Sequence, residues 1–462
     1  MLASIVNTFV NCFKIPELKS RILFTMAVLA ICRLSAYITM PGLNGAALKA
    51  YFDHIHTTGS SPLGMYNLFS GGALEHCAVG ALGIMPYISS TIVLQLLTAV
   101  VPSLSKLARE DGGRVKIIKY GRYLTVLICI GQGLLMTRGW ENPRNVPGFS
   151  NFQGDLVLYH GAWLWWYRFQ TVLLLTVGTL LLMWLGEQVT DRGIGNGISL
   201  IITINILARL PDAGQGLLDL FKSDSGNLAN AIVLLALLVV VVGGTIALTQ
   251  TQRKIPVQYA QRAVGRKIYS GGTSFLPLNL NFSGVMPIIF AQAILMVPQM
   301  VFSWLGRSHG WIWASNLGAS LNEGGIVHLS VYTLMILFFA YFWTATQFNE
   351  LQIADDLKKN GGYVPGVRPG QATSNFLHNA MNRITLAGAI FLTLIAIVPI
   401  ILYHRMHIPN PVAQFFGGTS LLITVGVVLD TMRQMESHLM MRHYDGFLRG
   451  GRGGGSRLRG RF

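Results

Sequence analysis

The sequence has few charged residues: Asp, Glu, Lys and Arg make up 12% of its 462 residues, whereas hydrophobic residues make up 52%. A soluble domain typically contains about 25% charged residues. The composition therefore excludes a soluble multidomain enzyme as the first interpretation. It favours a protein that crosses a membrane several times.

Cysteine is also scarce, with four residues at positions 12, 32, 77 and 129, and no two of them have the CxxC spacing. We expect neither a disulfide framework nor a metal site. His54 and His56 are separated by one residue, which is a weak metal-binding pattern that we discount. The amphipathic lead before the first apolar run is expected to be a surface helix rather than a cleaved signal peptide.

Motifs of catalysis and nucleotide binding are missing. The chain has no GxxxxGK motif followed by Ser or Thr and no HExxH, and the glycines at 193, 195 and 197 do not form the GxGxxG fingerprint. No catalytic pair lies at a plausible depth in an apolar segment. We therefore expect no enzyme activity, no catalytic residue and no cofactor.

Long apolar runs are what the sequence does contain. A helix needs roughly 20 apolar residues to cross the hydrocarbon core, and about ten segments approach this length. They are 21–41, 77–100, 118–138, 167–187, 195–211, 228–250, 284–305, 328–348, 382–403 and 411–433. The sequence thus predicts an all-α membrane protein with ten transmembrane helices.

Basic residues divide unevenly between the two sides that these spans define. Of the 35 Lys and Arg residues, 26 lie on the side that holds both termini, eight lie on the other side and Arg33 lies inside the first span. Cytoplasmic loops are enriched in Lys and Arg. Both termini are therefore expected in the cytoplasm, and most of the net charge of +16 lies on that face.

Two cytoplasmic loops, 251–283 and 349–381, are long, basic and patterned. The first contains IPVQYA, which alternates as a strand does, between two basic clusters. The second begins as a helix that Gly361 and Gly362 should end, and its Pro-Gly turns present Arg368 on a stiff tip. We interpret the loops as a docking surface, with an inert loop as the alternative. The candidate docking residues are Arg253, Lys254, Arg262, Arg266, Lys267 and Arg368.

The stretch 66–98, YNLFSGGALEHCAVGALGIMPYISSTIVLQLLT, begins like a membrane segment but contains Gly71-Gly72, Glu75 and His76, and Pro86 interrupts it. Lipid neither solvates a carboxylate nor hydrogen-bonds exposed backbone. The residues alone leave two interpretations open, a loop on the outer surface or a segment that re-enters the membrane inside protein. Arg33, in the middle of the first span, could serve helix packing or line a pore.

Several motifs occur together and in order: FSGGALE with ALGIMPYISSTIVLQLLT, GEQVTDRGIGNGIS (186–199), RKIPVQYAQR with GRKIY, VPGVRPGQ and FGGTSLLI (416–423). With them, the chain from about Arg21 to Met441 closely resembles the SecY family, the channel subunit of the bacterial protein translocase. The resemblance implies two inverted five-helix halves, 1–212 and 213–433, followed by a basic Gly/Arg-rich cytoplasmic tail, 434–462. The tail after Met441 is expected to be disordered by composition.

The resemblance also implies roles for individual residues. A re-entrant plug helix would occupy about 63–78 and include Phe69, Ser70, Gly71, Gly72, Ala73, Leu74 and Glu75. A pore ring that excludes water when the channel is idle would consist of Ile84, Ile88, Ile198, Ile202, Ile289 and Ile423. A lateral gate between the second and seventh spans would be bridged by Ser89, Ser90, Gln95 and Gln292.

The implied function is a protein-conducting channel that translocates unfolded polypeptides across the bacterial plasma membrane and inserts membrane proteins laterally. The implied partners are SecE, SecG, the SecA motor ATPase, the ribosome with its nascent chain, signal sequences and membrane lipids, with YidC and SecDF as further candidates. The alternative is a secondary transporter of a small solute, although few ionisable residues besides Arg33 and Asp430 lie in the spans. An intramembrane protease is a more distant alternative.

Overall fold

The structure is a computed structural model that describes residues 15–58, 66–67, 69–110, 112–143, 156–159, 161–222, 228–259, 262–264, 267–269, 272–321, 325–406, 412 and 419–450. The helices are α2 (Pro16–Leu34), α3 (Gly45–Thr58), α5 (Met85–Val100), α6 (Pro102–Arg109), α7 (Gly113–Glu141), α8 (Leu164–Arg192), α9 (Gly197–Leu207), α10 (Leu210–Lys222), α11 (Leu228–Gln250), α12 (Met286–His309), α13 (Ile312–Ser320), α14 (Ile326–Gln347), α15 (Glu350–Lys359), α16 (Gln371–Met406) and α18 (Thr419–Gly450). A 3-10 turn, η2 (Gly161–Trp163), precedes α8.

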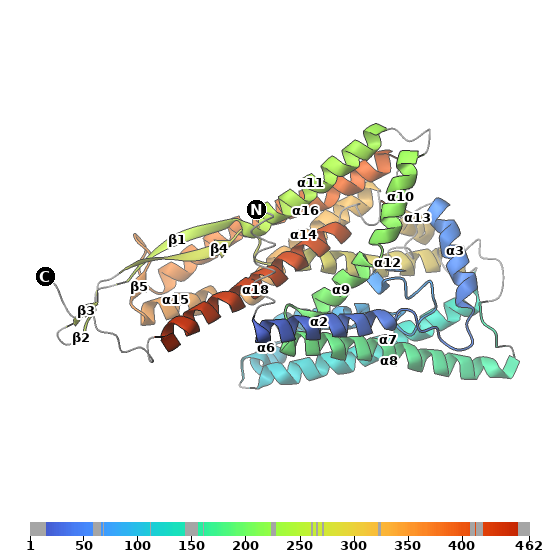
Figure 1. Ribbon diagram of the computed structural model, residues 1–462, viewed down its shortest axis with the longest axis horizontal. Coiled ribbons are helices and arrows are strands. Elements are labelled where there is room, and N and C mark those ends of the chain that lie inside the picture. Colours follow the sequence, from blue (N-terminus) through green and yellow to red (C-terminus); the bar gives the residue numbers. More distant parts are fainter. Residues whose placement is uncertain are drawn as a thin grey trace.

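The strands are β1 (Gln252–Tyr259), β2 (Arg262–Val264), β3 (Lys267–Tyr269), β4 (Thr273–Asn279) and β5 (Gly362–Tyr363). Most of the described chain is helical, as predicted, and the strands lie at one end of the molecule, on the left in Figure 1. α3 and α13 lie at the opposite end.

Each predicted span overlaps a helix. However, fewer than ten of the described helices are long and apolar enough to count as membrane spans. Among the described residues, five helices are long and apolar enough to cross a membrane, or six if α5 and α6, which are bent by 104° at their junction, form one broken span. α5 starts only at Met85, because Pro86 at its first turn has a fixed φ suited to a helix start. The number of ten therefore stays a prediction.

The long helices form two sets that repeat one pattern of neighbours. In the first set, α2 packs against α8 and α9, while α7 packs against α5 and α8. In the second set, α11 packs against α16 and α18, while α14 packs against α12 and α16. The two sets meet where α9 packs against α18 and where α5 packs against α12. α10 leads from the end of α9 toward α11 (Figure 1).

The two patterned loops form one folded unit, which adds a small sheet to the predicted all-α architecture. β1 pairs antiparallel with β4 on one side and with β5 on the other, so strands from both loops share a sheet. Ile255 and Val257 of the predicted strand are buried, whereas Lys254 and Pro256 are exposed and Gln258 is half-buried. Ile255 belongs to a buried cluster with Phe348, Val364 and Leu377.

Two predictions for the chain ends have different outcomes. The residues after Met441 were expected to be disordered, yet α18 continues to Gly450. No proline interrupts this part of the sequence, so nothing in the backbone chemistry forces the helix to stop. Residues 451–462 and the lead 1–14 lie outside the described residues.

Candidate functional site

The six isoleucines predicted to form a pore ring meet in one apolar cluster. Ile84, at the start of α5, and Ile88 come from one chain segment, and the others come from α9, α12 and α18. Five of the isoleucines are buried members of this cluster. Ile198 is half-buried and packs against it. The cluster lies where the two helix sets meet, because α5 faces α12 and α9 faces α18.

The glycine-rich turn before α9 fixes the position of two of these isoleucines. The side chain of Asn196 caps α9 by accepting hydrogen bonds from the backbone N–H groups of Ile198 and Ser199, at 3.1 and 3.4 Å. The N–H of Gly195, which has a φ of +87°, donates to Gln434 of α18 at 2.9 Å. The N–H of Ile194 donates to Thr25 of α2 at 3.1 Å. The turn thus ties the start of α9 to both helix sets.

The predicted plug segment is helical only in part, since its described residues 66–67 and 69–70 are helical and turns follow them. Residues 71–84 form consecutive turns, and Gly71, Gly72 and Gly83 have positive φ values of 68°, 87° and 59°. Glycine adopts such conformations at little cost, so the glycines that marked the segment also prevent a continuous helix. The predicted residues from Phe69 to Glu75 are all buried, and residues 63–65 and 68 lie outside the described chain.

Polar side chains from two helices hold the backbone of this segment. Nη1 of Arg33, on α2, donates to the carbonyl oxygen of Gly71 at 2.8 Å. Nδ2 of Asn205, on α9, donates to the carbonyl oxygen of Phe69 at 3.0 Å. These bonds satisfy backbone groups that turns leave without intrahelical partners. Arg33 also donates to Oδ1 of Asn205 on α9 at 3.4 Å, which fits the predicted alternative of helix packing, and its contact with Gly71 is a role that neither alternative included.

Glu75 has an ion-pair partner that the sequence did not indicate. Nη2 of Arg209, just after α9, donates to Oε2 of Glu75 at 2.7 Å. Nδ2 of Asn67 donates to the same oxygen at 2.9 Å. Nη1 of Arg209 also donates to Asp212 at 3.3 Å. The buried carboxylate therefore accepts a charge-assisted and a neutral hydrogen bond, which is what burial of a charge requires.

The predicted gate residues do not all face the α5–α12 contact. Ser90 is buried and its hydroxyl donates to the carbonyl oxygen of Gly121, on α7, at 2.6 Å. This hydrogen bond joins α5 to α7, and the predicted role of Ser90 as a bridge to α12 stays a prediction. Ser89 and Gln95 are half-buried on α5, and Gln292 is half-buried on α12. Their roles stay predictions.

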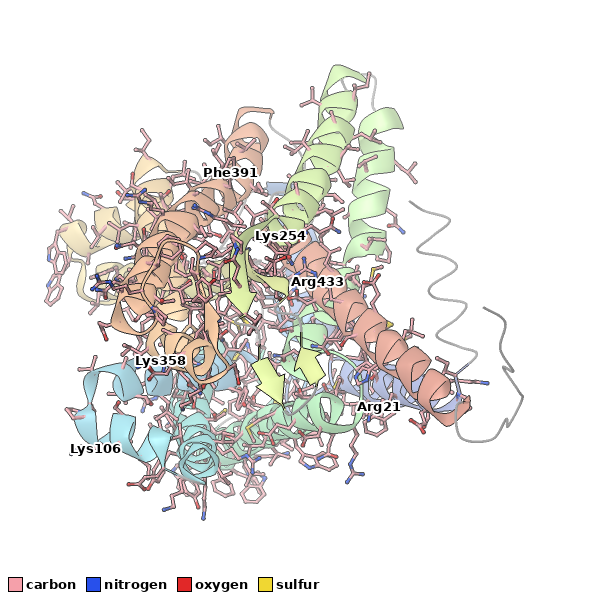
Figure 2. All side chains as sticks on the ribbon, turned by 90° about the vertical axis from the view of Figure 1, so that its left-hand side faces the viewer. Arg21, Lys106, Lys254, Lys358, Phe391 and Arg433 are labelled. Atoms are coloured by element: carbon pink, nitrogen blue, oxygen red, sulfur yellow. The ribbon has the colours of Figure 1, made fainter. Side chains whose placement is uncertain are left out.

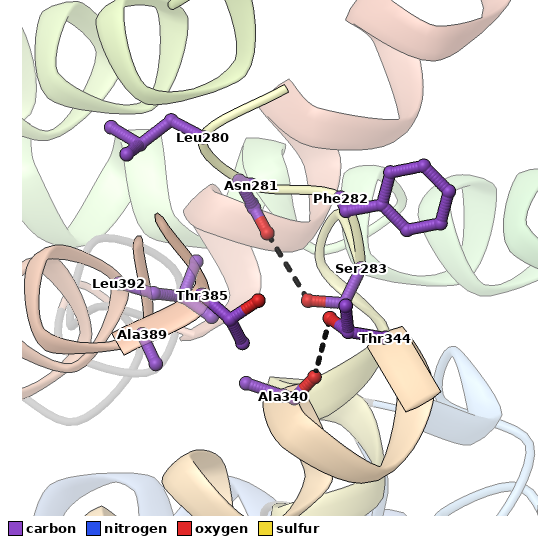
Figure 3. Close-up of a pocket in the computed structure, with 9 residues that line it drawn as sticks. All are labelled: Leu280, Asn281, Phe282, Ser283, Ala340, Thr344, Thr385, Ala389 and Leu392. Carbon is purple, nitrogen blue, oxygen red and sulfur yellow. Dashed lines mark hydrogen bonds between the residues drawn. The ribbon is translucent and has the colours of Figure 1, made fainter. Parts of the chain in front are cut away.

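A small set of polar side chains fixes the connection from β4 to α12 (Figure 3). Nδ2 of Asn281 donates to the carbonyl oxygen of Gly284 at 2.9 Å, and the hydroxyl of Ser283 donates to Oδ1 of Asn281 at 3.2 Å. Thr344 and Thr385 line the same pocket from α14 and α16. These local hydrogen bonds shape the connection that leads from the sheet to the start of α12.

Five of the six predicted docking residues lie at the strand end of the molecule. Arg253, Lys254 and Arg368 are exposed there, while Arg262 and Lys267 lie on β2 and β3, and Arg266 lies outside the described residues. Figure 2 views this end and labels five cations that come from different elements, namely Arg21, Lys106, Lys254, Lys358 and Arg433. The basic surface is thus assembled from most of the length of the chain.

Sequence comparisons decide the family. A family model described as SecY matches residues 78–432. The protein translocase subunit SecY of Chlamydia trachomatis serovar D is 41% identical, with 95% of this chain and 97% of the relative covered. The protein of the same name from Escherichia coli strain K12 is 39% identical, with 94% of each chain covered. The chain belongs to the SecY family. It is a membrane protein with several apolar spans, as its SecY relatives and described helices indicate.

Solved structures agree at the level of the fold. One described as the structure of a protein conducting channel has a TM-score of 0.61 at 17% identity, with 90% of this chain and 91% of the other covered. Sec61 from a canine ribosome–channel complex of the endoplasmic reticulum has a TM-score of 0.59 at 18% identity, with the same coverage. The SecY-family chain therefore has the helical fold of these channels.

Sequence reasoning missed the residues that contact the plug segment. Asn67 precedes the motif FSGGALE, and Asn205 and Arg209 lie in and after a short apolar span, NILARLP. The available signals were an amide inside an apolar span and a cation at its end, both of which are unusual in lipid. Neither signal indicates which segment the side chain contacts.

Proposed function

We propose that this chain is the protein-conducting channel of a bacterial plasma membrane, through which unfolded polypeptides cross and from which membrane proteins leave laterally. The supporting observation is that the six isoleucines all belong to, or pack against, one apolar cluster where the helix sets meet, next to a buried plug segment. Aliphatic side chains exclude water from a narrow passage without any fixed charge. They can also separate around a passing polypeptide of any sequence.

The proposed organisation follows the predicted halves. Residues 1–212 contribute α2 to α9 and the plug, residues 213–433 contribute the second helix set and the docking loops, and 434–462 form the tail. Both termini face the cytoplasm, as the distribution of basic residues suggests. A passage between two halves suits this function, because a small relative movement widens it.

The energy for transport comes from partners, since the family is one of channel subunits and not of enzymes. We propose that SecA and the ribosome bind the basic surface containing Arg253, Lys254 and Arg368, through carboxylates or RNA phosphates. SecE and SecG accompany the chain, and YidC and SecDF assist it. Membrane lipids and signal sequences contact the gate formed by α5 and α12.

The transporter alternative is less well supported. Coupled transporters place ionisable groups at a substrate site near the midplane. Here Arg33 donates to a backbone carbonyl of the plug segment, and Arg209 pairs with Glu75. Both cations are therefore engaged in holding the plug rather than in lining an ion pathway.

Ion conductance tests the proposed function directly. The complex containing the full chain is reconstituted in planar bilayers, intact and with residues 66–76 deleted. We expect no current from the intact channel and large, unselective currents after the deletion, because the ring excludes water only while the passage is narrow and the deletion removes the segment that fills it. Silence in both forms, with saturable uptake of a small solute, would favour the transporter.

A further inference from the structure

The two plug glycines lie against positively charged side chains. A Cβ atom built on Gly71 would lie against Nη1 of Arg33 and within 2.8 Å of Oδ1 of Asn205. A Cβ atom on Gly72 would lie 2.9 Å from Nη2 of Arg209. A side chain at either position would therefore displace a guanidinium group from the plug backbone. The glycine pair thus allows two guanidinium groups to approach the plug backbone closely.

The two arginines hold the plug in different ways. Arg33 and Asn205 bind backbone carbonyl groups, and such bonds are available to almost any sequence in this conformation. Arg209 binds a side-chain carboxylate, Glu75, so this contact depends on charge. The side chains of Arg209 and Glu75 are 16% and 9% exposed, which places the pair in a region with little water.

The position of Arg209 links the plug to the connection between the halves. Arg209 follows α9, whose Ile198 and Ile202 belong to the proposed ring, and it precedes α10. Its second ion pair, with Asp212 on α10, is 3.3 Å long and Asp212 is more than half exposed. When Glu75 leaves, Arg209 therefore keeps a partner in water, which lowers the free energy needed for release.

We infer that Arg209 is a positioning residue whose ion pair with Glu75 keeps the plug seated, with Arg33 and Asn205 as supporting contacts. The inference rests on the proposed channel function and specifies how its closed state is maintained. Removing Glu75 takes away the charge-dependent contact with the plug, although Arg209 keeps Asp212. Removing Arg209 leaves the Glu75 carboxylate without its guanidinium partner, which is strongly unfavourable in the seated conformation. The unseated plug places the same charge in water. Loss of either partner therefore shifts the equilibrium toward the unseated plug.

The test measures the current through idle channels in planar bilayers for Glu75→Gln, Arg209→Gln and the double variant. We expect each single variant to conduct roughly tenfold more often than the native channel. This effect is smaller than the one expected for a fully buried ion pair, because solvent partly screens the exposed part of Arg209. The double variant should conduct no more often than the single variants, because both remove the same interaction. Arg209→Lys retains the positive charge, so the current through its idle channels should stay close to that of the native channel.

Two matched controls separate the ion pair from general loosening. Glu141→Gln breaks a 2.7 Å ion pair with Arg168 between α7 and α8, which is as short as the plug ion pair but does not contact the plug. Asp212→Asn removes the other partner of Arg209 and leaves Glu75 paired. Both should stay silent. Currents from Glu141→Gln equal to those from Arg209→Gln would overturn the inference.

The plug deletion distinguishes failure of the inference from failure of the proposed function. If the deletion conducts while Glu75→Gln and Arg209→Gln stay silent, the channel proposal stands and the inference is wrong. If the deletion is also silent, both fail. If Arg209→Gln does not accumulate in the membrane, Glu75→Gln decides alone, because it preserves the size of the side chain and leaves Arg209 intact.

Discussion

At the scale of single residues, Arg368 offers a test of the docking surface. Its side chain is exposed at a tip that Gly366 and Gly370 shape with φ values of 82° and 101°, and its carbonyl oxygen accepts a bond from Thr373 at 2.8 Å. Arg368→Glu reverses the charge without changing these backbone contacts. We expect translocation into vesicles to fall at least roughly tenfold, as for a lost charge-assisted contact, while the protein remains folded.

Lys358→Glu is the matched control for Arg368, because it introduces the same charge change on exposed α15 at the same end of the molecule (Figure 2). If partners contact Arg368 specifically, Lys358→Glu should change translocation into vesicles very little. Equal losses in both variants would mean that partners sense only the overall field. Unchanged transport by Arg368→Glu would contradict the docking role.

The candidate site could be predicted only in part from single residues. Glu75 and Arg33 drew attention because ionisable groups in apolar segments are unusual, yet the pair Glu75–Arg209 joins positions far apart in the sequence. Nothing local indicates such a partner. Ser90 shows the same limit, because its position on α5 predicts a polar contact but not that the acceptor is on α7.

At the scale of elements, the sheet of β4, β1 and β5 joins the two patterned loops, so we expect the two loops to unfold together. Ile255 is buried and pairs in register with Leu276. Ile255→Ala should destabilise the unit by about 2–5 kcal/mol, because it removes buried methyl groups and leaves a cavity. Hydrogen exchange should then accelerate in β4 and also in β5, on the other loop.

Lys254→Ala is the control for this element, since Lys254 precedes Ile255 but is exposed, and surface substitutions usually change stability by less than about 0.5 kcal/mol. Exchange in the sheet should match that of the native protein. If Ile255→Ala accelerated exchange in β4 alone, β5 would not belong to the same cooperative unit.

Elements were predictable where the pattern is local. IPVQYA alternates and forms β1, and Gly361, with a φ of +70°, follows the end of α15. The pairing of β1 with β5 was not predictable, because it depends on packing between distant loops. The plug segment was predicted as a helix, but its glycines favour turns after residue 70, and the contacts with Arg33, Asn205 and Arg209 help to stabilise these turns.

At the scale of the whole molecule, each helix set packs mainly within itself, and the sets meet at the α9–α18 and α5–α12 contacts. Two such sets should assemble even when the covalent link between them is cut. We expect fragments 1–224 and 225–462, produced together, to form a complex that translocates protein, because the interfaces that hold each set are intact within one fragment. Co-purification followed by transport into vesicles measures this.

A cut at 194–195 is the matched control, because it interrupts the turn that ties α9 to α2 and α18. There the N–H groups of Ile194 and Gly195 donate to Thr25 and Gln434, and α9 would be separated from α8, against which it packs. These fragments should not yield an active complex. If both cuts were equally harmful, the continuous chain between the sets would be needed for assembly. If both were tolerated, the glycine turn would not be what positions α9, and the isoleucines of α9 would depend on the α9–α18 contact alone.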